Sequence, residues 1–398
     1  MDAFKPFFVA ALPEIRFGAG KIDETAEVLS RFGQKALLVT GRRSFSASPH
    51  WQRLLKDLKS RDIAWEQVRV EDEPSPALVD EAVARFKGAD IQVVAGIGGG
   101  SVLDAAKAIA GLLITGNSVL EHLEGVGRGL PYLGPAVPLV AVPTTAGTGS
   151  EATKNAVLSV RGAGGFKKSF RHEQLVARVA IVDPQLLATC PKSLIAADGM
   201  DAFTQLLESY VSANASPFTD ALAFSGLENF RDGFWAAWEP QRPDAAAGYG
   251  RIAYASLLSG ITLAQAGLGS VHGLASPLGA YFPIPHGVVC GTLVAEATAV
   301  NLSALRERRP DSPALVKYAR IAELLTQRRH ADQDEAGDAL VALLRDWLQQ
   351  LDLPRLGACG MGPEQLDKVV ANCRGGSMQT NPLVLSDAEL RGLLESRM

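Results

Sequence analysis

Three polar side chains in the second half of the sequence have the types and the spacing of a metal site. Asp201 lies in the segment GMDAFTQLLESYVS, and His272 and His286 lie in GLGSVHGLASPLGAYFPIPHG. The 398 residues include only six histidines, so two within one short, mostly apolar segment stand out. One carboxylate and two imidazoles suit a catalytic Zn²⁺ or a non-haem Fe²⁺. We predict that these residues bind a divalent metal ion.

Gln205 follows Asp201 by four residues, which places both side chains on one face of a predicted helix. A histidine there would complete a metal-binding pair, whereas glutamine offers a neutral carbonyl oxygen or leaves its place to water. We therefore predict that Gln205 lies near the ion and that the affinity is lower than with a histidine. Because glycine and proline interrupt the segment between His272 and His286, the two rings must converge by a fold-back of the chain.

A glycine-rich turn ends one predicted strand. The segment VVAGIGGGSVLDAAKAIA carries Gly98, Gly99 and Gly100, and glycines let backbone amides approach a phosphate closely. Ser101 then begins a helix, with Asp104 three residues later in an arrangement that resembles a capping box. The turn predicts a pyrophosphate-binding site at the amino terminus of this helix.

A second loop, VPTTAGTGSEATKN, follows another predicted strand. It offers four side-chain hydroxyl groups, those of Thr144, Thr145, Thr148 and Ser150. Ligands of α/β proteins bind at the carboxyl ends of the strands, where such loops meet. The two loops together predict a dinucleotide site, and we add Lys167 to the residues predicted to bind the cofactor.

The end of a third predicted strand bears on the choice of nucleotide. Gly41 is followed by Arg42, Arg43 and Ser44. A carboxylate in this place would bind the ribose hydroxyls of NAD and repel a 2′-phosphate, whereas a glycine followed by arginines leaves room and positive charge for that phosphate. We assign Gly41 and Ser44 to the NAD(P) site, and the pattern favours NADP.

The elements that must position these groups change character along the chain. Four short apolar runs predict buried strands, over residues 35–41, 91–101, 138–145 and 177–183. Helical patterns such as residues 75–88 separate them, which is typical of an α/β layer with parallel strands. After Pro184 long helical patterns dominate. We predict an α/β nucleotide-binding domain over residues 1–185 and an all-α metal- and substrate-binding domain over residues 186–398.

Composition excludes several classes of partner. The formal net charge is −4 and no run of basic residues occurs, so we expect neither nucleic acid nor a membrane surface as a partner. The amino terminus lacks the basic start of a signal peptide, which predicts a cytoplasmic protein. The four cysteines are scattered without CxxC spacing, so we expect buried, reduced thiols rather than disulfides or a cysteine zinc site.

Four segments carry a family resemblance. GGGSVLDAAKAIA, VPTTAGTGSEAT, GMDAFTQLLESYVS and VHGLASPLGAYFPIPHG resemble, in order and spacing, the signature segments of the iron-containing (group III) alcohol dehydrogenases. The resemblance covers essentially the entire chain. It implies a dehydroquinate synthase-like architecture, a nucleotide domain followed by a helical metal domain, with NAD(P) and an alcohol or aldehyde bound in a cleft between them.

The resemblance also assigns residues. It implies that Asp201, His272 and His286 hold the ion, and it places Gln205 where the family has its first histidine ligand. Ser276 falls where the family has a histidine associated with proton relay, so we assign catalytic roles to His272, Ser276 and His286. The implied function is an NAD(P)-dependent alcohol dehydrogenase or aldehyde reductase, assisted by Fe²⁺ or Zn²⁺, and we expect a homodimer.

Three alternatives stay open at this stage. The first is a metal-independent reductase of activated carbonyls that resembles the maleylacetate reductases. The second is a dehydroquinate synthase-like lyase, and the third is a nucleotide-binding protein without catalysis. No cluster of arginines occurs in the motif segments, so the default substrate is a small neutral alcohol or aldehyde.

Overall fold

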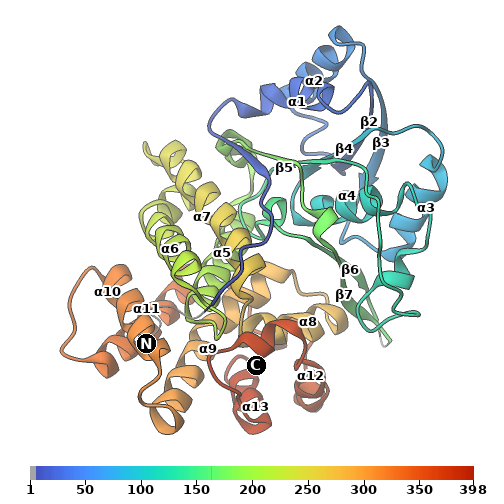
Figure 1. Cartoon of the computed structure of the whole chain (residues 1–398). Helices are drawn as coiled ribbons and strands as arrows, with labels where there is room; N and C mark the ends of the chain where they lie inside the picture. Colours follow the sequence, from blue (N-terminus) through green and yellow to red (C-terminus); the bar gives the residue numbers. More distant parts are fainter. Residues whose placement is uncertain (1–5, 163) are drawn as a thin grey trace. The chain divides into compact units, whose positions relative to one another are not determined.

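The computed structural model describes residues 6–162 and 164–398. The chain divides into two compact units. The α/β unit comprises Ala10–Val160 and Lys167–Cys190, and the helical unit consists mainly of Pro191–Met398. Figure 1 colours the first largely blue to green and the second from green to red. The predicted succession of an α/β part and an all-α part is confirmed.

A six-stranded parallel sheet forms the centre of the α/β unit, with the order β1-β8-β5-β4-β2-β3. Strands β6 and β7 form a separate two-stranded sheet. The strands are β1 (Glu14–Phe17), β2 (Lys35–Gly41), β3 (Ala64–Val70), β4 (Val93–Gly98), β5 (Leu139–Pro143), β6 (Asn155–Val160), β7 (Phe166–Arg171) and β8 (Val179–Val182). All four strands predicted from apolar runs are present, as β2, β4, β5 and β8.

Helices cover both faces of this sheet. One apolar cluster joins Ala36 and Leu38 of β2 to residues of α1 (Thr25–Ser30) and α2 (Pro49–Ser60). On the opposite face α4 (Gly100–Leu112) packs so closely that a Cβ at Gly96 would lie 2.8 Å from Ala106, and α3 (Pro76–Phe86) lies beside α4. Strands covered on both faces read as continuous apolar runs, which is why the central ones were predictable.

The order of the strands reverses next to β2. From β2 the chain passes to β3 on one side, and β4 then lies on the other side of β2. The register pairs Thr40 with Ile97 and Gly98 with Pro143, so the ends of β2, β4 and β5 lie next to one another. A reversal of this kind is where open α/β sheets bind their ligands.

Nine α-helices make up most of the described residues 191–398. They are α5 (Lys192–Val211), α6 (Pro217–Trp238), α7 (Ala245–Ala266), α8 (Ser270–Tyr281), α9 (His286–Arg308), α10 (Pro313–Thr326), α11 (Gln333–Gln350), α12 (Leu366–Asn372) and α13 (Asp387–Glu395). Short 3-10 turns occur in both units, at Lys21–Glu24, Val119–His122, Ser150–Ala152, Glu173–Leu175, Pro184–Thr189, Gly357–Cys359, Pro363–Gln365 and Gly376–Thr380. A shared apolar core joins α8, α9, α12 and α13 near the carboxyl terminus (Figure 1).

Helix α5 is the central helix of this unit. Almost every residue from Ile195 to Val211 is buried, and α5 packs against α6, α7 and α9. A helix enclosed on all sides must find partners for its polar side chains, because an unpaired buried polar group costs free energy. Asp201, Gln205 and Glu208 therefore depend on the neighbouring helices for their partners.

One described helix is long and apolar enough to span a membrane. It is α9, with a mean hydropathy of 1.6, and 72% of the apolar window is buried within the protein. This is the composition expected of a helix that packs on all sides in a protein core.

Candidate active site

The two histidines come from consecutive helices that fold back on each other. His272 lies in the first turn of α8, and His286 is the first residue of α9. Pro277 lies inside α8, which runs from Ser270 to Tyr281, so the two histidines belong to different helices and do not share one helical face. The expected fold-back does occur, in the short connection between α8 and α9.

A glycine brings the start of α9 against α5. A Cβ at Gly287 would lie 2.4 Å from the carbonyl oxygen of Ala197, so no larger residue fits at this crossing. Asp201 lies one turn further along α5. Close contact between the two helices therefore places the His286 ring beside the Asp201 carboxylate.

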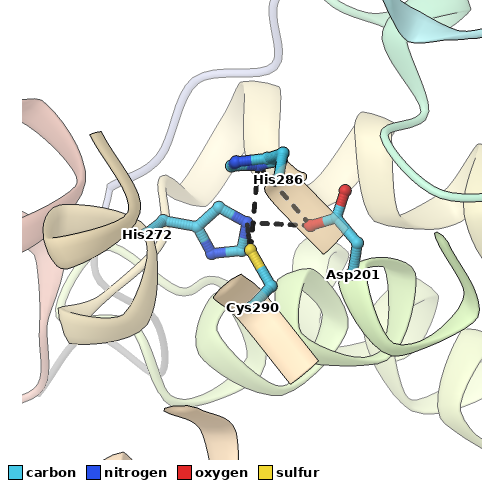
Figure 2. A group of neighbouring side chains, drawn as sticks. All are labelled: Asp201, His272, His286 and Cys290. Atoms are coloured by element: carbon cyan, nitrogen blue, oxygen red, sulfur yellow. Dashed lines mark hydrogen bonds and ion pairs between the residues drawn. The ribbon is translucent and has the colours of Figure 1, made fainter. Parts of the chain in front are cut away.

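Four side chains converge at this crossing, as Figure 2 shows. Nε2 of His272 lies 3.2 Å from Oδ1 of Asp201, and Nε2 of His286 lies 3.7 Å from the same oxygen. Sγ of Cys290 lies 3.5 Å from Nε2 of His272 and 3.7 Å from Nε2 of His286. The four potential ligand atoms all lie within 4.8 Å of one another.

Glu208 fixes the orientation of one ring. Its Oε2 lies 2.7 Å from Nδ1 of His272, and its carboxylate also accepts hydrogen bonds from the backbone amides of Val271 and His272. A carboxylate on one ring nitrogen is the usual way in which a protein directs the other nitrogen toward a metal. Nε2 of His272 therefore faces Asp201 and Cys290.

Replacing Glu208 by glutamine is expected to weaken metal binding by about tenfold to a hundredfold, the usual effect of losing such a supporting carboxylate. The glutamine keeps the size and the hydrogen-bonding oxygen but loses the negative charge. Competition with a chromophoric chelator measures the affinity, and Glu239→Gln, an exposed position after α6, is the control. Unchanged affinity in the Glu208 variant would contradict this role.

The electrostatics of the cluster suit a cation. Burial opposes ionisation of Asp201, but the nearby His286 and the hydrogen bond from His272 hold the pKa of this carboxyl at about 2. Burial also opposes a charge on His272, yet Cys290, Asp201 and Glu208 raise its pKa well above the ordinary value. Burial raises the pKa of the Cys290 thiol to about 12. The carboxylate is thus ionised at neutral pH, and a metal ion competes with a proton for the His272 ring.

The predicted nucleotide loops lie side by side at the ends of β4 and β5. Backbone N–H of Thr144 donates to the carbonyl of Gly98 over 3.0 Å. A Cβ at Gly100 would lie 2.8 Å from the Thr148 side chain, and one at Gly99 would lie 3.3 Å from Thr145. The glycines therefore let the two loops pack against each other at the amino terminus of α4, where backbone amides favour an anion.

The expected capping box at Ser101 and Asp104 was wrong. Helix α4 begins at Gly100, and Gly99 is its N-cap residue without a side-chain cap. Asp104 instead accepts a 2.7 Å hydrogen bond from the Ser150 hydroxyl. The turn between β4 and α4 is shorter than the capping-box pattern requires. The helix therefore begins at Gly100, one residue before Ser101.

A buried lysine ties these loops together. Lys107 is fully buried, and its Nζ donates to the hydroxyls of Ser150 and Thr153 and to the carbonyl of Asn155, over 2.7–2.8 Å. Asp104 lies 3.6 Å away, which partly offsets the burial that lowers the pKa of Lys107 to about 8. The Ser150 hydroxyl thus points toward Lys107 and Asp104. Lys107 is a positioning residue that was not predicted from the sequence.

The comparisons with known proteins agree with this arrangement. The family model "Iron-containing alcohol dehydrogenase" matches residues 13–184, and "Fe-containing alcohol dehydrogenase family, C-terminal" matches residues 195–398. The chain belongs to the iron-containing alcohol dehydrogenase family. It is therefore an oxidoreductase of the alcohol dehydrogenase type.

Individual relatives share both sequence and fold. Alcohol dehydrogenase 4 of Saccharomyces cerevisiae is 32% identical over 297 residues, which cover 74% of this chain and 75% of that protein. The crystal structure of a 1,3-propanediol oxidoreductase superposes with a TM-score of 0.89 at 27% identity, over 99% of this chain and 100% of that one. Sulfoacetaldehyde reductase from Bifidobacterium kashiwanohense, solved in complex with NAD⁺, gives 0.83 at 25% identity, over 99% of each chain.

Two positions depart from the family pattern stated above. Gln205 is buried on α5, and its Oε1 accepts a 3.1 Å hydrogen bond from the Ser259 hydroxyl of α7. Ser276 lies half-buried on α8, one turn after His272 and hence on the same face. Gln205 is thus hydrogen-bonded to α7, while Ser276 presents a hydroxyl on the helix that carries His272.

The remaining predicted cofactor residues, Gly41, Ser44 and Lys167, lie at the end of β2, in the loop after it and on β7. Gly41 is the last residue of β2, and Ser44 lies in the exposed loop that follows. Lys167 lies on β7, where its Nζ is 3.1 Å from Oε1 of Glu73. The structure thus brings Gly41 next to the turn at Gly98, because β2 and β4 are neighbours, and it pairs Lys167 with a carboxylate.

Two residues at the candidate metal site, Glu208 and Cys290, were not predicted from the sequence. Glu208 was present in the quoted helix segment, three residues after Gln205 and on the same face as Asp201, and that spacing could have indicated it. Cys290 follows His286 by four residues. The sequence lacks CxxC spacing, the usual pattern of cysteine ligands, so it gives no such signal at Cys290.

Proposed function

We propose that this chain transfers a hydride between a nicotinamide dinucleotide and a small neutral alcohol or aldehyde, with a divalent ion held by Asp201, His272 and His286. The observation that carries this proposal is the convergence of these three side chains, drawn from α5, α8 and α9, at one point. One anionic carboxylate and two imidazoles fit a catalytic Zn²⁺ or Fe²⁺. Such an ion supplies a Lewis acid that polarises the substrate oxygen.

The chain's own residues prepare this chemistry. Glu208 holds the His272 ring with its Nε2 toward Asp201, and α5, buried on all sides, keeps the Asp201 carboxylate fixed. The hydroxyl of Ser276 is our proposed proton-relay group. Since a serine hydroxyl does not titrate near neutral pH, it can pass a proton only together with water or the ribose hydroxyls of the cofactor.

An activity screen tests the function directly. Purified protein is stripped with a chelator, its metal content is measured, and turnover of small alcohols and aldehydes is followed with NAD(H) and NADP(H) before and after Fe²⁺ or Zn²⁺ is restored. We expect turnover that depends on the restored ion. Full turnover by demonstrably metal-free protein would support the alternative, a metal-independent reductase of activated carbonyls.

We also propose NADP(H) as the preferred cofactor, and Gly41→Asp is the test. The Gly41 backbone is compatible with a side chain, and a Cβ there would lie 3.7 Å from Val102, an ordinary contact. Its carboxylate would repel the 2′-phosphate, so we expect the affinity ratio of NADPH to NADH to fall by about tenfold or more. Fluorescence titration of both reduced cofactors measures the ratio.

The neutral variant Gly41→Asn is the matched control for this experiment, because it adds a similar volume without the charge. It should change the ratio much less than the aspartate. Tighter binding of NADH than of NADPH by the unmodified protein would refute the preference for NADP.

The homodimer and the cytoplasmic location stay predictions. Sedimentation velocity measurements test the oligomeric state.

A further inference from the structure

The thiol of Cys290 has different contacts from the thiols of Cys190 and Cys373. Cys190 donates to the carbonyl of Thr144, and Cys373 donates to the carbonyl of Val370, both ordinary backbone contacts. Cys290 is fully buried, and its Sγ lies within 3.7 Å of the Nε2 atoms of both histidines instead (Figure 2). These nitrogens are the atoms that a metal ion would use.

The distances match a tetrahedral site. With bonds of about 2.3 Å to sulfur and about 2.0 Å to nitrogen or oxygen, tetrahedral angles separate sulfur from nitrogen by about 3.5 Å and nitrogen from oxygen by about 3.3 Å. The two sulfur–nitrogen distances are 3.5 and 3.7 Å. The two nitrogen–oxygen distances are 3.2 and 3.7 Å. These four distances are close to those of a tetrahedral site, and the remaining two pairs lie within 4.8 Å, so the four atoms could contact one ion.

The helices explain how a thiol reaches this place. Cys290 follows His286 by four residues on α9, so both side chains leave the same face of that helix. Gly287 holds this face against α5. Asp201 and Gln205 have the same spacing on α5, but the Oε1 of Gln205 is hydrogen-bonded to Ser259 on α7. The residue four positions after a proposed ligand therefore faces the site on α9, as Cys290, whereas on α5 the corresponding residue, Gln205, is bonded to α7.

We propose that Cys290 is the fourth protein ligand of the metal, in place of the residue at position 205, and that the resulting oxygen, nitrogen, nitrogen and sulfur set selects Zn²⁺ over Fe²⁺. This inference rests on the proposed metal-assisted function. A thiolate is a softer donor than an imidazole or a glutamine carbonyl, and in this oxygen–nitrogen environment it favours zinc. This proposal differs from the expectation from sequence that a cysteine zinc site is absent.

Cobalt substitution tests the ligand directly. The chelated full-length protein is loaded with Co²⁺, whose visible d–d bands report that the ion is bound and whose near-ultraviolet charge-transfer band reports a thiolate ligand. We expect both signals in the unmodified protein. In Cys290→Ser the charge-transfer band should vanish while d–d bands persist at saturating Co²⁺, and the affinity for Zn²⁺ should fall by at least about a hundredfold.

Two further variants separate the alternatives. Cys373→Ser is the matched control, since it changes another buried thiol of the helical unit and can keep its hydrogen bond to Val370; it should retain the charge-transfer band. Gln205→Ala should also retain the band, because position 205 is not the ligand proposed here. A Gln205 variant that loses bound Co²⁺ while Cys290→Ser keeps the affinity of the unmodified protein would overturn the proposal.

The outcomes distinguish this inference from the proposed function. Bound Co²⁺ with d–d bands but no charge-transfer band in the unmodified protein would refute the thiolate ligand and leave metal-assisted catalysis standing. Failure to bind Co²⁺ at all would overturn both. Equilibrium dialysis against mixed Fe²⁺ and Zn²⁺ under anaerobic conditions then measures selectivity. The ratio of bound Zn²⁺ to Fe²⁺ should fall by about tenfold or more in Cys290→Ser.

Discussion

Replacing His272 by alanine is expected to remove the bound divalent ion and to lower kcat/KM for a small alcohol by about a thousandfold or more, because a metal that polarises the reacting oxygen supplies several kcal/mol. His272 is buried, and its two ring nitrogens contact Asp201 and Glu208, so the variant loses a proposed metal ligand and leaves both carboxylates without this partner. The measurement pairs metal content after dialysis with steady-state kinetics.

The controls for His272→Ala address folding and specificity. His50→Ala removes a histidine from α2 of the α/β unit and should leave metal content and turnover unchanged. Circular dichroism establishes whether the His272 variant keeps its helices. A folded, metal-free His272→Ala protein with undiminished turnover would contradict metal-assisted catalysis, and the histidines would then have structural or proton-transfer roles.

Replacing Lys107 by methionine should have the largest effect on stability. We expect the free energy of unfolding of the α/β unit to fall by about 3–5 kcal/mol, the usual result of removing one partner from a buried charged network. Methionine fills a similar volume, but three oxygen acceptors lose their donor and the half-buried Asp104 carboxylate loses a positive charge 3.6 Å away. Urea denaturation measures the loss, and hydrogen exchange in β4 and β5 locates it.

Two variants show whether the network is the cause. Lys168→Met changes the exposed neighbour of Lys167 on β7 and should alter stability by no more than about 0.5 kcal/mol. Asp104→Asn added to Lys107→Met should restore part of the loss, because the remaining carboxylate is then neutral. Equal stability of Lys107→Met and the unmodified protein would mean that the buried amine does not hold the two loops in place.

The central strands of the sheet could be predicted from the sequence, and its edges could not. Strands β2, β4, β5 and β8 are covered on both faces, which demands continuous apolar runs. The edge strands β1 and β3 are largely exposed, so they lack this signal. The turn after β4 was recognised by its glycines, but the first residue of α4 was misplaced because the close packing of Gly100 against Thr148 is a tertiary contact.

The sequence by itself determined the chemical types at the candidate metal site and the family to which the chain belongs. Asp201, His272 and His286 were recognisable because carboxylates and imidazoles in apolar segments have few other uses. Only the tertiary structure decided that Cys290 joins them and that Glu208 directs His272. Helical spacing indicates which side chains share a face, but the packing of α8 and α9 on α5 determines which of those faces meet.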